Sequence, residues 1–186
     1  MPRCFKFSKE EILSEAINLV REKGFSALSA RSLSNSLGSS SKPIFSVFNN
    51  MENLQKEVLK EADRIYNEYL SLKMKESEYP SYKASGMAYI RFSKEEKELF
   101  KLLFMRDRSS EIISEDKSSI KPILEIIMKN LNIGEDEAYK LHIEMWVFVH
   151  GIAAMISTGF ITWDEEFISS ALTDAYSGLK HKYEVK

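Results

Sequence analysis

The sequence predicts an all-α fold in which an N-terminal three-helix helix-turn-helix domain precedes a C-terminal helical bundle. Residues 29–54 carry apolar side chains spaced as a short helix, a tight turn, a second short helix and the start of a third. Only 7 Gly and 4 Pro interrupt 186 residues, which favours long helices over many short strands. Downstream of residue 54, apolar positions recur at helical spacing, so we expect helices throughout.

The first short helix is expected to begin after Ser29, whose hydroxyl can accept a hydrogen bond from a free backbone N–H. Gly38 is expected to end this helix, because glycine adopts a left-handed conformation at little cost. In the segment that follows, Ser40 can cap a new helix and Pro43 is tolerated in its first turn. This second short helix should turn Ile44 and Phe48 inward together with the valine between them.

The charge distribution indicates that the N-terminal quarter approaches a polyanion. The chain has 26 basic and 28 acidic residues, yet residues 24–51 contain no Asp or Glu. Residues 1–50 hold 7 Lys or Arg against 4 Glu, a net charge of +3, so the other 136 residues carry −5. A segment with a net positive charge favours contact with phosphates.

The residues expected on the outer side of the helix-turn-helix are mostly small, polar or cationic. Such side chains position a helix on the DNA backbone, although a merely solvated helical hairpin is the alternative. We predict that the following residues contact DNA: Ser29, Arg31, Ser39, Ser40, Ser41, Lys42, Phe45, Ser46 and Asn49.

Residues 7–59 resemble the DNA-binding domain of the TetR family of bacterial transcriptional regulators. The family's first helix carries Ile and Ala at helical spacing and ends in Gly-Phe or Gly-Tyr, which here are Ile12, Ala16, Gly24 and Phe25. The recognition helix and the turn after it match residues 44–54. The resemblance implies a homodimer that binds a palindromic operator in double-stranded DNA.

The chain departs from the family at three positions, where Phe45, Val47 and Met51 replace the usual Tyr, His and Lys. The resemblance implies that the tyrosine hydroxyl and the lysine bind phosphates, so that role must shift to other groups. The candidates are Lys42, the serines, Asn49, the backbone N–H groups of residues 50–53, and Arg3 and Lys6 on the N-terminal arm. Phe45 can still press on a thymine methyl group.

We expect the third helix to run from about residue 50 to 75 and to pass from one domain into the other. The predicted domains are a DNA-binding domain at 1–53 and a ligand-binding and dimerisation domain at 54–186. Further helices are expected over about residues 80–94, 95–106, 118–131, 134–158 and 163–183, with a loop at 106–117.

Residues 145–156 are apolar on nearly every side, so both faces of this helix should be covered. One face can meet the domain's own core, and the other most naturally meets a second copy of the protein. A buried central helix in a monomer is the alternative. The predicted dimer interface uses this helix and the last one: Phe148, Ile152, Met155, Ile156, Ile168, Leu172, Ala175 and Leu179.

Residues 146–151 are similar to the Trp, His-Gly pattern that names one class of C-terminal ligand domains in TetR regulators. The resemblance implies that the last two helices form the dimer and that the others enclose an effector pocket. Methionine and aromatic side chains can line an adaptable cavity, or they can simply fill the core. The predicted pocket, for a small apolar or amphipathic effector, consists of Met87, Phe92, Phe100, Phe104, Trp146 and His150.

The sequence offers little for catalysis. None of the 3 His follows a Glu by three residues, so the Glu-x-x-His spacing of di-iron helical bundles is absent. Cys4 has no base near it in sequence, and no glycine-rich phosphate loop occurs. We predict no catalytic residue, no metal site and no cofactor.

A lone cysteine suits a reducing cytoplasm, and we expect no signal peptide and no stretch of about 20 apolar residues that could span a bilayer. The sequence thus predicts a cytoplasmic transcriptional regulator without a membrane partner. We interpret it as a repressor that a small molecule releases from DNA. A ligand-responsive protein-binding adaptor with a weakened helix-turn-helix is the main alternative, and an enzyme on a helical bundle is the third.

Overall fold

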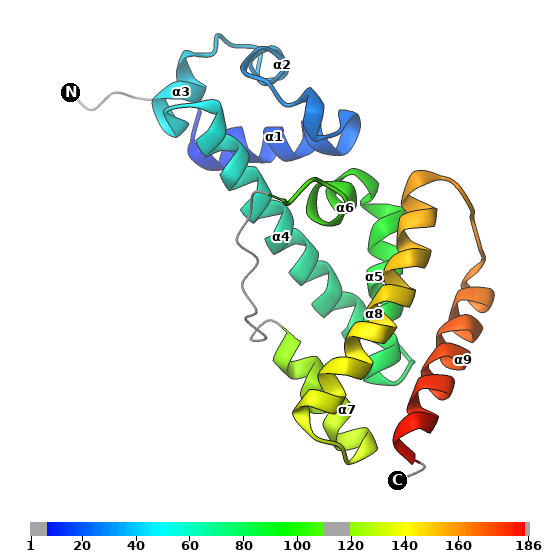
Figure 1. The fold of residues 1–186 in the computed structure, drawn as a ribbon. Helices are drawn as coiled ribbons and strands as arrows, with labels where there is room; N and C mark the ends of the chain where they lie inside the picture. Colours follow the sequence, from blue (N-terminus) through cyan, green and yellow to red (C-terminus); the bar gives the residue numbers. More distant parts are fainter. Residues whose placement is uncertain (1–6, 110–119, 185–186) are drawn as a thin grey trace. The chain divides into compact units, whose positions relative to one another are not determined.

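The computed structural model describes residues 7–109 and 120–184, and within them it contains helices and no strand, which confirms the all-α prediction (Figure 1). Cys4 and most of the predicted loop at 106–117 lie outside the described residues. The elements are α1 (Lys9–Lys23), a 3₁₀ turn η1 (Phe25–Ala27), α2 (Ala30–Ser36), α3 (Lys42–Phe48), α4 (Met51–Lys75), α5 (Ser81–Glu95), α6 (Lys97–Phe104), α7 (Lys121–Leu131), α8 (Glu135–Thr158) and α9 (Glu165–Glu184).

The chain divides into two compact units. The first unit comprises residues 1–68 and 96–106, and therefore holds α1, α2, α3, most of α4, and α6. The second unit comprises residues 69–95 and 107–186, with α5, α7, α8 and α9. These units are defined by packing. The predicted boundary between residues 53 and 54 separates a DNA-binding domain from a ligand-binding domain by function, and it stays a prediction.

The first unit is organised around α1. Ser8 caps this helix, because its hydroxyl accepts a hydrogen bond from the Glu11 N–H at 3.1 Å while the Glu11 carboxylate accepts one from the Ser8 N–H at 2.7 Å. Helix α6 packs on α1. The large apolar side chains that are completely buried in this unit are Ile12, Val20, Leu33, Ile44, Leu54, Val58, Leu99 and Phe100.

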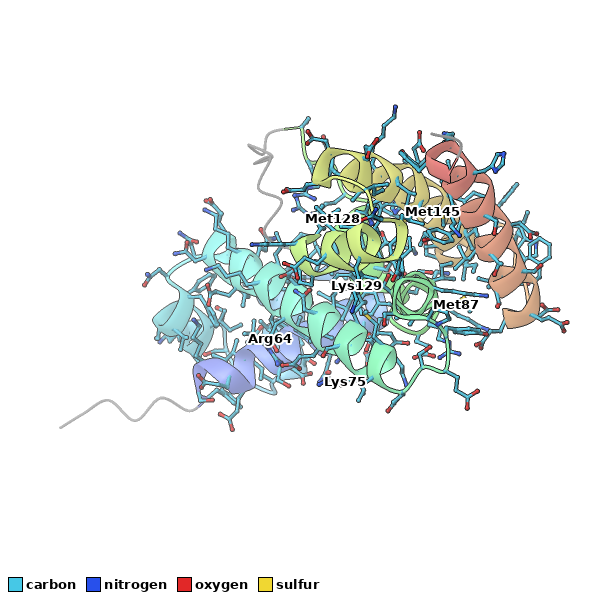
Figure 2. The ribbon with its side chains drawn as sticks, turned by 90° about the horizontal axis from the view of Figure 1, so that it is seen from below. Arg64, Lys75, Met87, Met128, Lys129 and Met145 are labelled. Carbon is cyan, nitrogen blue, oxygen red and sulfur yellow. The ribbon has the colours of Figure 1, made fainter. Side chains whose placement is uncertain are left out.

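The second unit is a bundle in which α5 contacts α7, α8 and α9. Gly86 of α5 allows close approach, since a Cβ at this position would lie 3.4 Å from Leu172 and 3.5 Å from Val149. Figure 2 labels three methionines of this unit, Met87, Met128 and Met145, which come from α5, α7 and α8. Met87 and Met145 are buried.

Helix α8 corrects one expectation from the sequence. It is long and apolar enough to cross a membrane by length and composition alone. No such stretch was expected. Because α8 contacts α5, α7 and α9, its composition is that of a helix that buries more than one face within a protein.

Candidate nucleic-acid interface

The helix-turn-helix begins as the sequence predicts. The Ser29 hydroxyl accepts a hydrogen bond from the Ser32 N–H at 3.1 Å, and α2 starts at the next residue, Ala30. The Ser32 hydroxyl in turn donates to the Ala27 carbonyl at 2.7 Å, which fixes the chain before the helix. Gly38 follows α2 with a φ of +58°, the left-handed conformation expected of it.

The cap predicted for the second short helix is wrong. Helix α3 begins at Lys42 after Ser41, and no side-chain hydroxyl caps it, so Ser40 does not have this role. Ser41 already has helical angles, with φ −73° and ψ −8°, and its side chain is therefore not placed as an extended N-cap residue would be. Pro43 in the first turn also removes one of the N–H groups that a cap would serve.

Helix α3 turns two side chains inward and the rest toward the surface. Ile44 and Phe48 are 0% and 3% exposed, whereas Val47, which was expected inside, is only half-buried. Phe45 is 38% exposed. None of the residues predicted to contact DNA is buried: Lys42, Phe45, Ser46 and Asn49 on and just after α3, Ser39, Ser40 and Ser41 in the turn, and Ser29 and Arg31 at the start of α2.

Some polar groups of this surface already have partners within the protein. The Ser46 hydroxyl donates to the Lys42 carbonyl at 2.8 Å, and the Ser29 hydroxyl belongs to the α2 cap. The Asn53 N–H donates to Oδ1 of Asn50 at 2.8 Å. Asn50 thus caps α4, a role that sequence reasoning missed although an Asn before a helix is a usual N-cap. One backbone N–H predicted to bind phosphate is therefore occupied.

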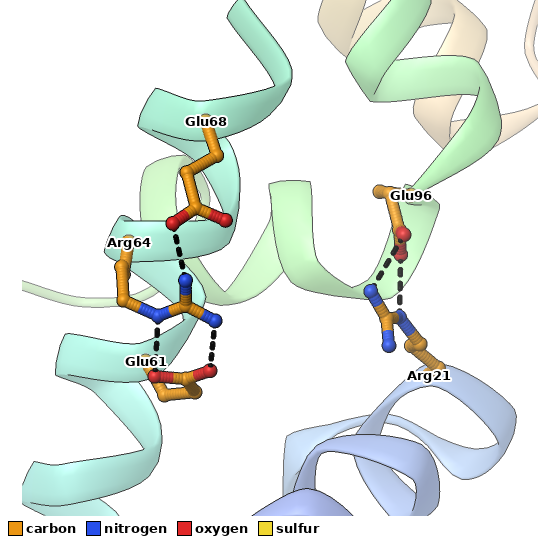
Figure 3. A network of polar contacts seen from close by, with 5 residues as sticks. All are labelled: Arg21, Glu61, Arg64, Glu68 and Glu96. Carbon is orange, nitrogen blue, oxygen red and sulfur yellow. Dashed lines mark hydrogen bonds and ion pairs between the residues drawn. The ribbon is translucent and has the colours of Figure 1, made fainter.

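Some lysines and arginines of the first unit are paired with carboxylates, and others are not. Lys9 is bonded to Glu57 at 2.5 Å, and Arg21 forms two hydrogen bonds of 2.8 and 2.9 Å with Glu96 (Figure 3). Among the residues that the structure describes, Arg31 and Lys42 form no ion pair, and both are exposed. These two cations are therefore available to phosphates, as the acid-free segment suggested.

Acidic and basic side chains further along α4 neutralise each other. Arg64 is bonded to both carboxylate oxygens of Glu61, at 2.6 and 2.9 Å, and also to Glu68 (Figure 3). Arg64 lowers the pKa of Glu61 through this hydrogen bond. Beyond its first turns, α4 therefore presents paired charges, in contrast to α2 and α3.

The predicted effector pocket is divided between the two units. Met87, Phe92, Trp146 and His150 lie in the second unit, whereas α6 places Phe100 and Phe104 in the first. There Phe104 packs against Phe100 and against Tyr66 of α4, with ring centroids 5.2 and 5.1 Å apart. The pocket stays a prediction.

In the second unit, aromatic side chains gather around two histidines. The Trp146 ring stacks on His150 with centroids 4.9 Å apart, and the Tyr89 hydroxyl lies 2.9 Å from Nδ1 of His150. The Tyr82 hydroxyl lies 3.3 Å from Nδ1 of His142 in the same way. Both tyrosines come from α5 and both histidines from α8, so these contacts join the two helices.

Burial lowers the pKa of His142 below its usual value of 6.5. The unfolded chain therefore binds a proton more readily, so the contribution of this histidine to stability is complete above about pH 6.5 and is lost as the pH falls. We expect acidification from about pH 7 to pH 5 to lower the melting temperature more in the parent than in His142→Gln. Thermal melts followed by circular dichroism measure this.

His181→Gln, which removes an exposed histidine of α9, is measured alongside as the control variant. An equal pH dependence in the parent and His142→Gln would show that this histidine does not couple protonation to folding.

The residues predicted at the dimer interface lie in two environments. Ile152, Ile156, Ile168 and Leu172 are at most 8% exposed and pack within one protomer, while Phe148 is 41% exposed. Met155, Ala175 and Leu179 are half-buried.

Three large apolar side chains of α8 are also exposed, namely Ile143 at 38%, Trp146 at 39% and Val147 at 60%. Ile143 and Val147 were not among the predicted interface residues. Their spacing of four places both on one face, but the sequence does not show which face of so apolar a helix is the outer one. With Trp146 they form what we call the α8 outer face, whereas Phe148 projects from another side of the helix.

Comparison with known proteins gives both a family and a fold. The sequence model described as "Tetracyclin repressor-like, C-terminal domain" matches residues 82–175. No curated protein matches the chain.

Three solved structures resemble the fold over almost the whole chain. A protein of unknown function from Rhodococcus sp. RHA1 has a TM-score of 0.69 at 16% identity, and the alignment covers 98% of each chain. A TetR-like transcriptional regulator from the same organism has a TM-score of 0.62 at 12% identity, covering 94% of this chain and 93% of that one. A TetR family protein from Vibrio parahaemolyticus has a TM-score of 0.57 at 19% identity, and the alignment covers 91% of this chain and 96% of that one.

Proposed function

The chain belongs to the tetracycline-repressor-like family, and from this premise we propose that it is a DNA-binding transcriptional regulator. The observation that carries the proposal is the surface of α2, the turn and α3. It contains no acidic residue, and its two cations, Arg31 and Lys42, form no ion pair among the described residues. A helix-turn-helix with these properties can place its second helix in the major groove while its serines and cations bind phosphates.

We further propose that two copies bind a palindromic operator in the cytoplasm. Two recognition helices must then enter successive major grooves, roughly 34 to 36 Å apart. The α8 outer face supports this assembly, because exposed apolar side chains grouped on one helix mark an interaction surface.

The regulator would act as a repressor that a small apolar or amphipathic effector releases. The effector would bind better to a dimer whose recognition helices no longer fit the operator, and it would therefore weaken DNA binding. By linkage, DNA would weaken effector binding by the same factor. The buried methionine and aromatic side chains of the second unit, such as Met87 and Phe92, suit an apolar ligand of this kind.

Lys42 and Phe45 should affect DNA binding in different ways. Lys42→Ala is expected to weaken binding and, if the ammonium group contacts a phosphate, to lower the slope of log K against log salt by about one unit. Phe45→Ala should weaken binding with little change in slope, because the phenyl ring offers only apolar contact. Titration of a duplex from upstream of the protein's own gene, at several salt concentrations, measures both quantities.

The matched control is Lys140→Ala, which removes the same charge from an exposed position in α8 of the second unit. It should leave both affinity and slope unchanged. If Lys42→Ala and Phe45→Ala also bind like the parent, α3 is not the recognition helix.

A protein-binding adaptor is the second candidate, and one observation favours it. Phe45 and Met51 lack the hydroxyl and the charge that the family uses on phosphates, which would suit a helix-turn-helix no longer under selection to bind DNA. The same titration separates the two functions, because an adaptor shows no salt-dependent affinity for the duplex.

A further inference from the structure

Lys9, the first residue of α1, contacts two other helices of the first unit, α4 and α3. Its Nζ atom lies 2.5 Å from Oε2 of Glu57 on α4. The same atom lies 5.9 Å from the centroid of the Phe48 ring, at the end of α3. Lys9 therefore links α1 to α4 and to the end of α3, the helix proposed to enter the major groove.

Helix α3 depends on such contacts for its orientation. It has only seven residues, Lys42–Phe48, so it is too short to be stable alone, and Ile44 and Phe48 are its two buried side chains. The chain leaves the helix through Asn49, whose φ of +64° lies in the region that few residues other than glycine adopt. The packing of Ile44 and Phe48 therefore holds α3 against the rest of the unit.

Glu57 is held in place by two lysines. It accepts hydrogen bonds from Lys9 and, at 2.8 Å, from Lys60 one turn later on the same helix. The hydrogen bond from Lys60, and after it the one from Lys9, lower the pKa of Glu57 to about 2. Since Lys60 belongs to α4 itself, Lys9 supplies the link from this carboxylate to another helix.

We propose that Lys9 is a positioning residue for DNA recognition, which orients α3 through its contacts with Glu57 and Phe48. It contributes to operator affinity without touching the DNA. This inference rests on the proposed function, since it requires that α3 recognises an operator.

Positioning and direct electrostatics predict opposite effects at Glu57. If this carboxylate acted only through its charge, replacing it with a neutral amide would strengthen binding to a polyanion. If it holds Lys9, the same substitution loosens α3 and weakens binding. If Lys9 contacted a phosphate, replacing it would lower the slope of log K against log salt by about 0.9. If Lys9 only positions α3, replacing it leaves the slope unchanged.

The experiment compares full-length Lys9→Met, Glu57→Gln, the double variant and Lys9→Arg with the parent. Each is titrated against an operator duplex and a scrambled duplex at several salt concentrations, after circular dichroism has shown that it is folded at the assay temperature. Glu68→Gln is the matched control, because Glu68 is an exposed glutamate of α4 whose ion pair, with Arg64, stays within that helix.

We expect Lys9→Met and Glu57→Gln each to weaken operator binding about three- to tenfold with an unchanged slope, as suits one exposed ion pair and one cation–π contact. The double variant should be no weaker than either single variant. Affinity for the scrambled duplex should change little. This distinguishes a loss of recognition from a general loss of folded protein, which would lower both affinities equally. Lys9→Arg should keep nearly the parental affinity, and Glu68→Gln should not weaken binding.

Glu57→Gln that binds as tightly as the parent, or more tightly, would overturn the inference. A lower slope for Lys9→Met would also overturn it, since that result assigns Lys9 to a phosphate. Either outcome leaves the proposed function intact as long as the parent prefers the operator. A parent without this preference would instead refute the proposed function.

Discussion

Val147→Lys is expected to turn the proposed dimer into a monomer and to weaken operator binding by about 100-fold or more. Val147 is the most exposed of the α8 outer face residues, at 60%, so a lysine there is harmless in a monomer but costly in an apolar interface. A monomer holds one half-site, and it loses the gain of about 10² to 10⁴ that two linked contacts provide. Analytical ultracentrifugation, with a 21.5 kDa protomer, and DNA titration measure the two effects.

Leu72→Lys is the control, because Leu72 is an exposed leucine of α4 at 52% and lies outside the α8 outer face. It should stay dimeric. A charged substitution of Leu172 would be uninformative, since that side chain is 3% exposed and its loss would unfold the protomer. A dimeric Val147→Lys with parental affinity would contradict the proposed interface, as would a parent that sediments as a monomer at micromolar concentration.

Phe100→Ala should lower the free energy of unfolding by about 3 to 5 kcal/mol, the range for a large aromatic side chain removed from a packed core. Phe100 is 0% exposed, and α6, which carries it, packs on α1. If Phe100 instead lined an open effector pocket, as the sequence suggested, its side chain would make fewer packing contacts. The substitution would then lower the free energy of unfolding by less. Denaturant unfolding at equilibrium measures the difference.

Phe45→Ala makes the same truncation at a side chain that is 38% exposed, and it should cost less than about 1 kcal/mol. A loss of similar size for Phe100→Ala would mean that Phe100 faces a cavity, and it would support the predicted pocket.

The helix-turn-helix could be predicted in detail because its signals are local. The Ser29 cap, the left-handed Gly38 and the inward Ile44 each depend on a few neighbouring residues. Ser40 and Ser41 show the limit of this reasoning. Adjacent serines carry the same capping signal, and only the backbone angles decide which one precedes the helix.

The packing partners of each helix could not be predicted from periodicity. An apolar stripe shows that Phe100 is buried, but it does not reveal that α6 packs on α1. In α8 nearly every face is apolar, so the sequence could not tell that Ile152 faces the protomer's core while Val147 faces outward. The bond between Lys9 and Glu57 joins residues 48 positions apart, among many charges that could have paired.

Selection from a pool of random-sequence DNA duplexes tests the central claim most directly, because it assumes no operator. A homodimeric regulator predicts enrichment of an inverted repeat whose half-sites lie about 10 base pairs apart, centre to centre, or a multiple of that spacing. The enriched duplex should bind more weakly as salt rises. A pool that shows no enriched sequence after selection by the folded parent protein would contradict the account.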